Sequence, residues 1–307
     1  MPRTPRLMII DEGQQAIYHV ISRTALDGLP FNAENKDMFV KILKSLSAIY
    51  FTEILGYSVM DNHFHLLVKM LPECNFSDDE IKRRFILKYG DKFVLDEKKL
   101  SFYRKKWSKL SDFIKELKQS FSVYFNKTRN RRGTLWGERF KSVLLEKGET
   151  LIHCLAYIDL NAVRAGMVKK PEEYRWCSIG YHIQTGNKES FLSLDFGLCE
   201  FGVKNDRERL KYYRKYLYEV GSEKQNNKAS ISSEAVNKER ERGYELSRVD
   251  RFLYRTRYFT DSGIIGSKAF VYENYLKFRH LFQSKHEKKP KKIQGLPNTF
   301  SLKQLQE

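Results

Sequence analysis

The pattern of hydrophobic and polar residues changes along the first third of the chain, from strand-like to helix-like and back to strand-like. Residues 16–23 ("AIYHVISR") are rich in β-branched and aromatic side chains, which is typical of a strand. Within residues 34–50, apolar side chains recur at the three- and four-residue spacing of a helix. Residues 51–60 and 63–70 then predict two more strands, joined tightly through the Asp-Asn turn at 61–62. This part of the chain therefore predicts the order β-α-β-β.

The next hundred residues continue the pattern after a polar helical insertion at residues 76–110. Residues 111–127 predict an amphipathic helix that Ser111 or Asp112 would cap. Residues 134–146 predict a strand, and residues 149–166 predict a helix that ends at a glycine. The order β-α-β-β-α-β is typical of an α+β protein. We expect a ferredoxin-like antiparallel sheet with helices on one face.

The remainder of the chain changes character. Residues 1–185 form the first predicted domain, and residues 186–243 read as a charged connecting region. Residues 244–307 regain apolar and aromatic content and end in a basic tail. We expect this last block to be a mainly helical accessory extension.

Net charge narrows the class of partner. The 307 residues carry a formal charge of +18, with 18 tyrosines, 21 phenylalanines and 3 tryptophans. Basic residues neutralise phosphates, and aromatic rings stack on unpaired bases. The balance therefore favours nucleic acid over an anionic membrane. The sequence has no apolar run of membrane-spanning length and no signal-peptide core at its start, so we expect a cytoplasmic protein.

Two histidines stand at the start of the third predicted strand, in "HFHLLVKM". Strand side chains alternate in direction, so His63 and His65 share one face and Phe64 takes the other. Two imidazoles on a rigid strand make half of a divalent-metal site. The spacing alone fits equally a pair of partly buried histidines that are hydrogen-bonded to neighbours.

The helix predicted at 149–166 presents a second group of polar side chains. Tyr157 and Asn161 are one turn apart, beside the apolar stripe, and Arg164 falls on the same flank as His153. A phenol, an amide and a guanidinium thus lie along one edge of a helix that must pack on the sheet. For an arbitrary helix, an interfacial tyrosine with a solvated polar neighbour would explain this pattern.

Taken together, these segments resemble a known family. The strings "YHVISRTALDGLPF", "YSVMDNHFHLLV" and "RGTLWGERFKSVLLE…LAYIDLNAVRAGMVKKPEEYRWCS" are similar to the single-tyrosine HUH transposases, especially the REP-associated tyrosine transposases. The resemblance covers residues 7–183. It implies a ferredoxin-like fold, a divalent metal (Mg²⁺ or Mn²⁺) and a tyrosine that attacks single-stranded DNA at a hairpin-bearing site.

Carried over by motif, the resemblance assigns roles to individual residues. It implies that His63 and His65 bind the metal, that Asn161 completes its coordination and that Tyr157 is the nucleophile. Attack by the phenol would leave a 5′-phosphotyrosine and a free 3′-OH. The chain departs from the family at Ala162, where many members have proline. Members of the wider family are monomers or homodimers, so we expect one of these two states.

Basic and aromatic residues near the last strand are candidate DNA contacts. The candidates are Arg129, Arg131, Arg132, Trp136, Arg139, Lys141 and Arg164. For each of them, a place in a solvated loop or in the core is the alternative. The function predicted is metal-dependent nicking and rejoining of single-stranded DNA. A nucleic-acid-binding regulator without catalysis and a hydrolytic metal nuclease remain the alternatives.

Overall fold

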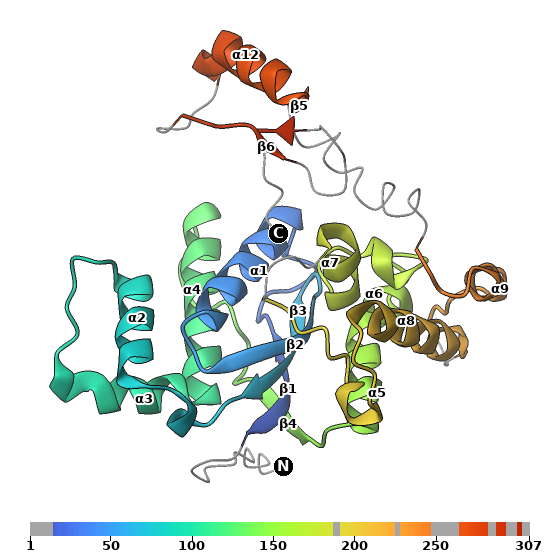
Figure 1. Ribbon diagram of the computed structural model, residues 1–307, viewed down its shortest axis with the longest axis horizontal. Coiled ribbons are helices and arrows are strands. Elements are labelled where there is room, and N and C mark those ends of the chain that lie inside the picture. The colour runs from blue at the N-terminus through green and yellow to red at the C-terminus, as the bar shows by residue number, and fades with distance from the viewer. Residues whose placement is uncertain are drawn as a thin grey trace.

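A four-stranded antiparallel sheet lies at the centre of the protein (Figure 1). The computed structural model describes residues 15–186, 191–224, 228–246, 264–281, 287–292 and 300–302. The strands are β1 (Ala16–Arg23), β2 (Thr52–Val59), β3 (His63–Met70) and β4 (Lys141–Leu145). They lie in the order β2-β3-β1-β4, so the long β3 and β1 occupy the centre. This arrangement confirms the predicted ferredoxin-like antiparallel sheet.

Two helices cover one face of the sheet. They are α1 (Ala33–Ser47) and α4 (Leu110–Thr128), which pack against each other and share an apolar core with the strands. Asn32 caps α1 through a reciprocal pair of hydrogen bonds with Asn35. The predicted cap of α4 is wrong. The helix begins one residue earlier, at Leu110, because that side chain is buried in the same core, and Lys109 takes the cap position without a side-chain bond.

The polar insertion forms two helices, as the sequence predicts. They are α2 (Asp78–Tyr89) and α3 (Leu100–Trp107), and they stand beside α4 in Figure 1. Trp107 anchors the insertion, because its side chain is fully buried and its carbonyl accepts a 2.9 Å hydrogen bond from Phe51 N. Short 3₁₀ turns join these elements and later ones: Glu73–Asn75, Glu97–Lys99, Pro171–Glu173, Cys199–Phe201 and Arg279–Leu281.

The opposite face of the sheet carries a second set of helices. They are α5 (Glu149–Asp159), α6 (Asn161–Arg164) and α7 (Ser178–Thr185). The helix predicted at 149–166 is thus divided at Leu160, although it ends as predicted at Gly166, whose φ is +69°. The strand predicted at 134–146 is shorter in the structure, where only β4 forms within this range. The earlier residues leave the strand path because the consecutive side chains of Leu135 and Trp136 both enter the same core.

Two charged helices extend the core on this second face. In α8 (Asp206–Ser222), Tyr213 and Leu217 are buried in the apolar cluster that contains α5, and α9 (Ser233–Glu241) adds Val236. The region predicted as a charged connection, residues 186–243, therefore supplies part of the packing that supports α5. None of the helices in the described part of the chain combines the length and apolarity that a membrane span requires.

The described part of the C-terminal block is a small separate unit in Figure 1. It consists of α12 (Lys268–Phe278) and three two-residue strands: β5 (Ile265–Gly266), β6 (Lys291–Lys292) and β7 (Phe300–Ser301). Val271, Tyr275 and Leu302 are its buried side chains. Much of the predicted accessory block, including residues 247–263, lies outside the described residues.

Arg214 holds the charged helices to the core through ion pairs that are closed to solvent. Its guanidinium donates to Glu172 at 2.7 Å and to Glu239 at 2.9 Å, and it also contacts the Tyr244 carbonyl. The Arg214 side chain is 1% exposed, and both carboxylates are similarly buried. Removing one member of such a buried network leaves uncompensated charges in a medium of low polarity.

We expect Arg214→Ala to lower the free energy of unfolding by about 3–5 kcal/mol, the range typical of a broken buried ion pair. Urea denaturation followed by circular dichroism would measure this. Lys215→Ala is the matched control on the same helix, because Lys215 is exposed and its only partner shown is Glu219 at 3.9 Å. Its effect should stay below about 0.5 kcal/mol. Equal losses for the two variants would show that the buried network is not what joins α8 to the core.

Candidate active site

The two histidines of β3 lie on the face of the sheet that α5 covers. Their neighbours Phe64 and Leu66 are fully buried in the core on the opposite face, as strand alternation requires. The His65 side chain is 4% exposed, and the His63 side chain is partly open. The two imidazole centroids are 5.1 Å apart. The structure thus brings the predicted pair together on one rigid strand.

A third histidine, on the neighbouring strand β1, joins this pair. His19 Nε2 lies 3.0 Å from His65 Nδ1, and the two rings stack with their centroids 5.2 Å apart. Sequence analysis did not select His19. Alternation along β1 places His19 on the same side as Ile17 and Ile21. Ile21 lies opposite His65, so the pairing of β1 with β3 brings His19 to the histidine pair.

Tyr157 completes the cluster from α5. Its ring centroid lies 5.6 Å from that of His65 and 6.0 Å from that of His19, in both cases edge to face. The tyrosine is 40% exposed, so its ring rests on the histidines while part of the side chain remains open to solvent. A phenol and three imidazoles from β1, β3 and α5 therefore meet on one face of the sheet.

Close backbone approach between β2 and α5 positions the tyrosine helix. The register of β2 against β3 shifts between Ile54 and Gly56, which forms a bulge in β2. A Cβ atom on Gly56 would lie 2.2 Å from Leu155 Cδ1 and 2.9 Å from Ser178 Oγ. Any side chain in place of Gly56 would collide with the Leu155 side chain, which would have to move. Ser178 also accepts a 2.7 Å hydrogen bond from Tyr57 N.

Burial keeps the three imidazoles uncharged at neutral pH. Loss of solvent lowers the pKa of His65 to about 3 and that of His19 to about 4. The pKa of His63 is also lowered, first by burial and then by the guanidinium of Arg23. A histidine must be neutral to offer a lone pair to a metal ion, so the site is in the correct protonation state.

The histidine pair could supply some of the ligands of a divalent metal, with the remaining ligands coming from outside the pair. His63 Nδ1 is 2.7 Å from the amide oxygen of Asn62, which can only accept, so Nδ1 carries the proton and Nε2 keeps a lone pair. In the described residues, no group of three or more His, Cys, Asp and Glu side chains is arranged to hold a metal. Two imidazoles would therefore leave most coordination positions to other ligands.

Of the two polar residues that follow Tyr157 on its helix edge, Arg164 contacts the tyrosine ring and Asn161 bonds to the backbone. Arg164 lies with Cζ 5.7 Å from the centre of the Tyr157 ring, in a cation–π contact. Asn161 is half-buried, and its amide donates to the Ile158 carbonyl at 3.4 Å, which leaves its oxygen as an acceptor. The position of Asn161 one turn beyond Tyr157 is as predicted, and its role as a metal ligand stays a prediction.

The candidate DNA contacts divide into two groups. Arg132, Arg139 and Lys141 are exposed. By contrast, Arg131 donates to Asn126 on α4 and to the Thr134 carbonyl in its own loop.

Trp136 and Arg129 each contact other parts of the protein. Trp136 is buried and donates to the Lys118 carbonyl at 3.0 Å, so its core alternative holds. Arg129 is exposed, and its guanidinium lies 5.6 Å from the centre of the Phe125 ring. Sequence reasoning missed Arg23, which is exposed at the end of β1 and paired in register with His63. Its guanidinium is close enough to contribute to the lowered pKa of His63.

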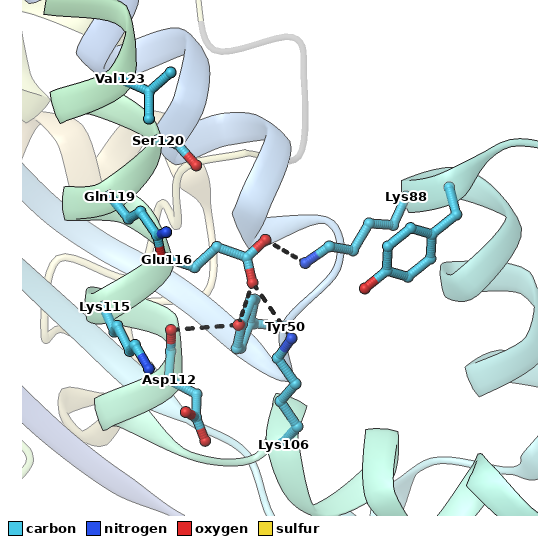
Figure 2. Close-up of a pocket in the computed structure, with 10 residues that line it drawn as sticks. Tyr50, Lys88, Lys106, Asp112, Lys115, Glu116, Gln119, Ser120 and Val123 are labelled. Carbon is cyan, nitrogen blue, oxygen red and sulfur yellow. Dashed lines mark hydrogen bonds and ion pairs between the residues drawn. The ribbon is translucent and has the colours of Figure 1, made fainter. Parts of the chain in front are cut away.

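A separate hollow of about 680 Å³ lies between the insertion and α4 (Figure 2). Glu116 stands at its centre, where it accepts a 2.7 Å hydrogen bond from the Tyr50 hydroxyl and contacts Lys88, with Lys106 at 3.8 Å. The carboxylate thus compensates the nearest lysines and ties α2 and α3 to α4. This hollow is built from the helices on the face away from the histidines, and it shares no residue with their site.

A comparison with known protein families finds a match to one part of the chain. Residues 13–83 match the family described as "Transposase IS200 like". The match covers 71 of the 307 residues. It contains His19, His63 and His65 and ends well before Tyr157. The placement of Tyr157 beside the histidines therefore comes from the geometry of α5.

Two solved structures that are similar to this chain are distant from it in sequence. One is a REP-associated tyrosine transposase bound to a REP hairpin, with 15% identity and a TM-score of 0.42, covering 63% of this chain and 92% of the other. Another is a protein from Deinococcus radiodurans R1 that is named only provisionally as a transposase, with 16% identity and a TM-score of 0.28, covering 52% and 96%. A search of curated proteins finds no match.

The contact at Gly56 predicts how the protein responds to one added methyl group. Gly56→Ala should displace Leu155 and lower the free energy of unfolding by about 1–3 kcal/mol, the usual cost of overpacking. Chemical denaturation would measure it. Adding Leu155→Ala removes the atoms that collide, so the double variant should lose less stability than the sum of the two single losses. Strict additivity would show that Gly56 does not set the position of α5.

Proposed function

We propose that the protein nicks and rejoins single-stranded DNA by transesterification, with Tyr157 as nucleophile and His63 and His65 as ligands to a divalent metal. In the first step, the Tyr157 oxygen bonds to phosphorus, the bond from phosphorus to the 3′ oxygen breaks, and the phenol proton passes through water to the departing 3′ oxygen. The products are a 5′-phosphotyrosine and a free 3′-OH. Attack by a 3′-OH on the phosphotyrosine reverses the step and rejoins the strand without ATP.

The observation that carries the proposal is the contact between Tyr157 and His65. A phenol ring lies 5.6 Å from an imidazole that shares its strand face with a second imidazole, which supports a nucleophile beside two metal ligands. Part of the tyrosine is open to solvent, where a DNA strand can reach it. A tyrosine that served only as packing would not need to remain 40% exposed at this position.

The protein groups around the tyrosine suit an anionic substrate. A divalent cation, when bound, neutralises the non-bridging phosphate oxygens and the charge that develops on them. Arg164, which stacks on the Tyr157 ring, and Arg23, which is paired with His63, supply fixed positive charge on either side of the histidines. One well-placed electrostatic group of this kind contributes about 3–4 kcal/mol to lowering a barrier.

Mg²⁺ and Mn²⁺ are the metals that suit this donor set. Mg²⁺ prefers oxygen ligands and keeps several waters, so two imidazoles and one amide oxygen would hold it weakly. The carbonyl oxygen of Asn161 is the proposed third ligand. We expect the remaining positions to be filled by substrate phosphate and water, which couples tight metal binding to the presence of DNA.

The DNA-facing surface is proposed to follow the exposed basic residues at the edge of the sheet. Arg132, Arg139 and Lys141 would contact phosphates and set affinity without reading bases. Preference for a hairpin comes to the proposal from the resemblance of the sequence motifs. The reaction is expected in the cytoplasm, and either a monomer or a homodimer is compatible with a site built from one chain.

Two other functions would leave different products. A hydrolytic metal nuclease, in which Tyr157 only orients a water molecule, would release both DNA fragments from the protein. A regulator without catalysis would bind hairpin DNA and leave it intact. The complete set of one phenol and two neutral imidazoles favours the transesterase over both.

Covalent attachment tests the role of Tyr157. Wild-type protein incubated with a hairpin-bearing single strand labelled at its 3′ end, in the presence of Mn²⁺, should carry the label through a denaturing gel. Tyr157→Phe removes the nucleophilic oxygen and keeps the ring, so it should fold and bind DNA but form no adduct. Tyr212→Phe is the matched control on an exposed tyrosine and should react like wild type.

Peptide mass spectrometry then locates the attachment. The nucleotide should be found on the peptide that contains Leu155–Arg164. An adduct on another tyrosine, such as Tyr124, or undiminished strand cleavage by Tyr157→Phe, would refute the assignment. Free cleaved fragments without any adduct would favour the hydrolytic nuclease.

Metal binding tests the role of the histidine pair. We expect His63→Ala and His65→Ala each to abolish strand cleavage and Mn²⁺ binding, measured by electron paramagnetic resonance, while hairpin affinity changes little because phosphate contacts supply most of it. His153→Ala, on the exposed side of α5, is the control and should retain both activities. Full cleavage by the double histidine variant, or by wild type in excess EDTA, would exclude a metal-dependent reaction.

A further inference from the structure

We infer that His19 is a positioning residue that accepts a hydrogen bond from His65 and thereby leaves the Nε2 lone pair of His65 free for the metal. The inference rests on the proposed function, because it concerns the same metal site. It gives a purpose to a buried imidazole that is neither a predicted ligand nor the nucleophile. The supporting observations are one short hydrogen bond, the strand register and the chemistry of neutral imidazoles.

The contact is short and closed to solvent. His19 Nε2 and His65 Nδ1 are 3.0 Å apart, and both residues are buried, at 7% and 4% exposure. The rings are nearly parallel, with an interplanar angle of 20°. Water therefore cannot easily replace either partner, so each ring orientation depends on the other.

Pairing between β1 and β3 fixes this geometry. Ile21 lies opposite His65 and His19 lies opposite Leu67, so His19 and His65 are diagonal neighbours on one face of the sheet. Diagonal neighbours across an antiparallel pair are within reach of long or aromatic side chains. Two central strands hold the two backbones, and the pair does not depend on a loop.

A neutral imidazole has one N–H donor and one acceptor nitrogen, so the bond between His19 and His65 can run in two directions. If His65 Nδ1 donates, the lone pair of His65 remains on Nε2. If His19 donates instead, the proton of His65 must sit on Nε2, and that nitrogen cannot bind a metal. Only the first direction makes His65 a ligand through Nε2.

The second ligand is held in the same way. His63 Nδ1 donates to the Asn62 amide oxygen at 2.7 Å, which leaves the lone pair on His63 Nε2. Each histidine of the pair thus has its Nδ1 bonded to a protein acceptor, one to an amide and the other to His19. This parallel arrangement is expected when the outer partner of a metal-binding histidine fixes its tautomer and ring plane.

Two substitutions separate the acceptor from the ring. His19→Gln keeps an acceptor oxygen near the position of Nε2, whereas His19→Leu fills similar space without one. We expect His19→Leu to weaken Mn²⁺ binding by about 10–100-fold, the range typical for loss of such a partner, and His19→Gln to remain within a few-fold of wild type. Hairpin affinity, which serves as the control for folding, should be unchanged in both.

The tautomer itself can be read without metal or DNA. In protein labelled with ¹⁵N at histidine, the Nδ1 of His65 should carry the proton in wild type and in His19→Gln, and His19→Leu should lose this preference. A proton on Nε2 of His65 in wild type, or wild-type Mn²⁺ affinity in a folded His19→Leu variant, would overturn the inference.

These readouts also separate the inference from the proposed function. If His65→Ala leaves Mn²⁺ binding intact, the metal proposal fails whatever His19 does. If His65→Ala abolishes Mn²⁺ binding and His19→Leu does not weaken it, only the role of His19 fails. Should His19→Leu not fold, the tautomer in wild type and the Mn²⁺ affinity of His19→Gln still decide the inference.

Discussion

The alternation of side chains along β3 is the constraint on which the rest of the structure depends. Phe64 and Leu66 must face the core formed with α1 and α4, because burying these two side chains stabilises the fold by several kcal/mol, at about 1.5–3 kcal/mol each. His63 and His65 are thereby forced onto the other face. A shift of one residue in register would bury both imidazoles among α1 and α4 and expose two large apolar side chains. Core packing therefore fixes the direction of the candidate ligands.

Helix α5 must then approach this second face closely enough for Tyr157 to touch the histidines. The bulge in β2 and the absence of a side chain at Gly56 permit that approach, and Leu155 fills the space. The charged helix α8 packs on the outer side of α5, where Tyr213 donates a 2.7 Å hydrogen bond to the buried Asp159. Two residues before that aspartate, Tyr157 is thus carried on a helix that is packed on both sides.

Much of the sheet and half of the site could be predicted from local patterns. The strands at 16–23 and 63–70 follow from their composition, and the shared face of His63 and His65 follows from a two-residue repeat. His19 could not be chosen, because its partner is 46 residues away and only the register of β1 against β3 reveals the contact. Arg23 was missed for the same reason.

Charged segments were the hardest to interpret. Residues 206–241 contain many Lys, Arg and Glu residues, which locally resemble a solvated connection. The fold instead buries Arg214 between Glu172 and Glu239, so three charges that look exposed in sequence are closed to solvent. Such compensation is a tertiary property, since Glu172 is 42 residues from Arg214. Trp136 misleads in the opposite way, because a tryptophan in a basic loop suggests stacking on a base, whereas its ring completes the core beside Phe31 and Phe64.

The site has a buried part and a part that is open to solvent, and each serves a different step of the proposed chemistry. His19 and His65 are buried, which keeps them neutral and fixes their mutual hydrogen bond. Tyr157 and Arg23 lie at the solvent boundary, where a flexible anionic strand can reach them. A fully buried tyrosine could not meet DNA, and fully exposed histidines would titrate near neutral pH and lose ring orientation. The boundary between the two regions runs through the contact between the Tyr157 ring and His65, so the position of α5 on the sheet decides both the access to the proposed nucleophile and the burial of the proposed ligands.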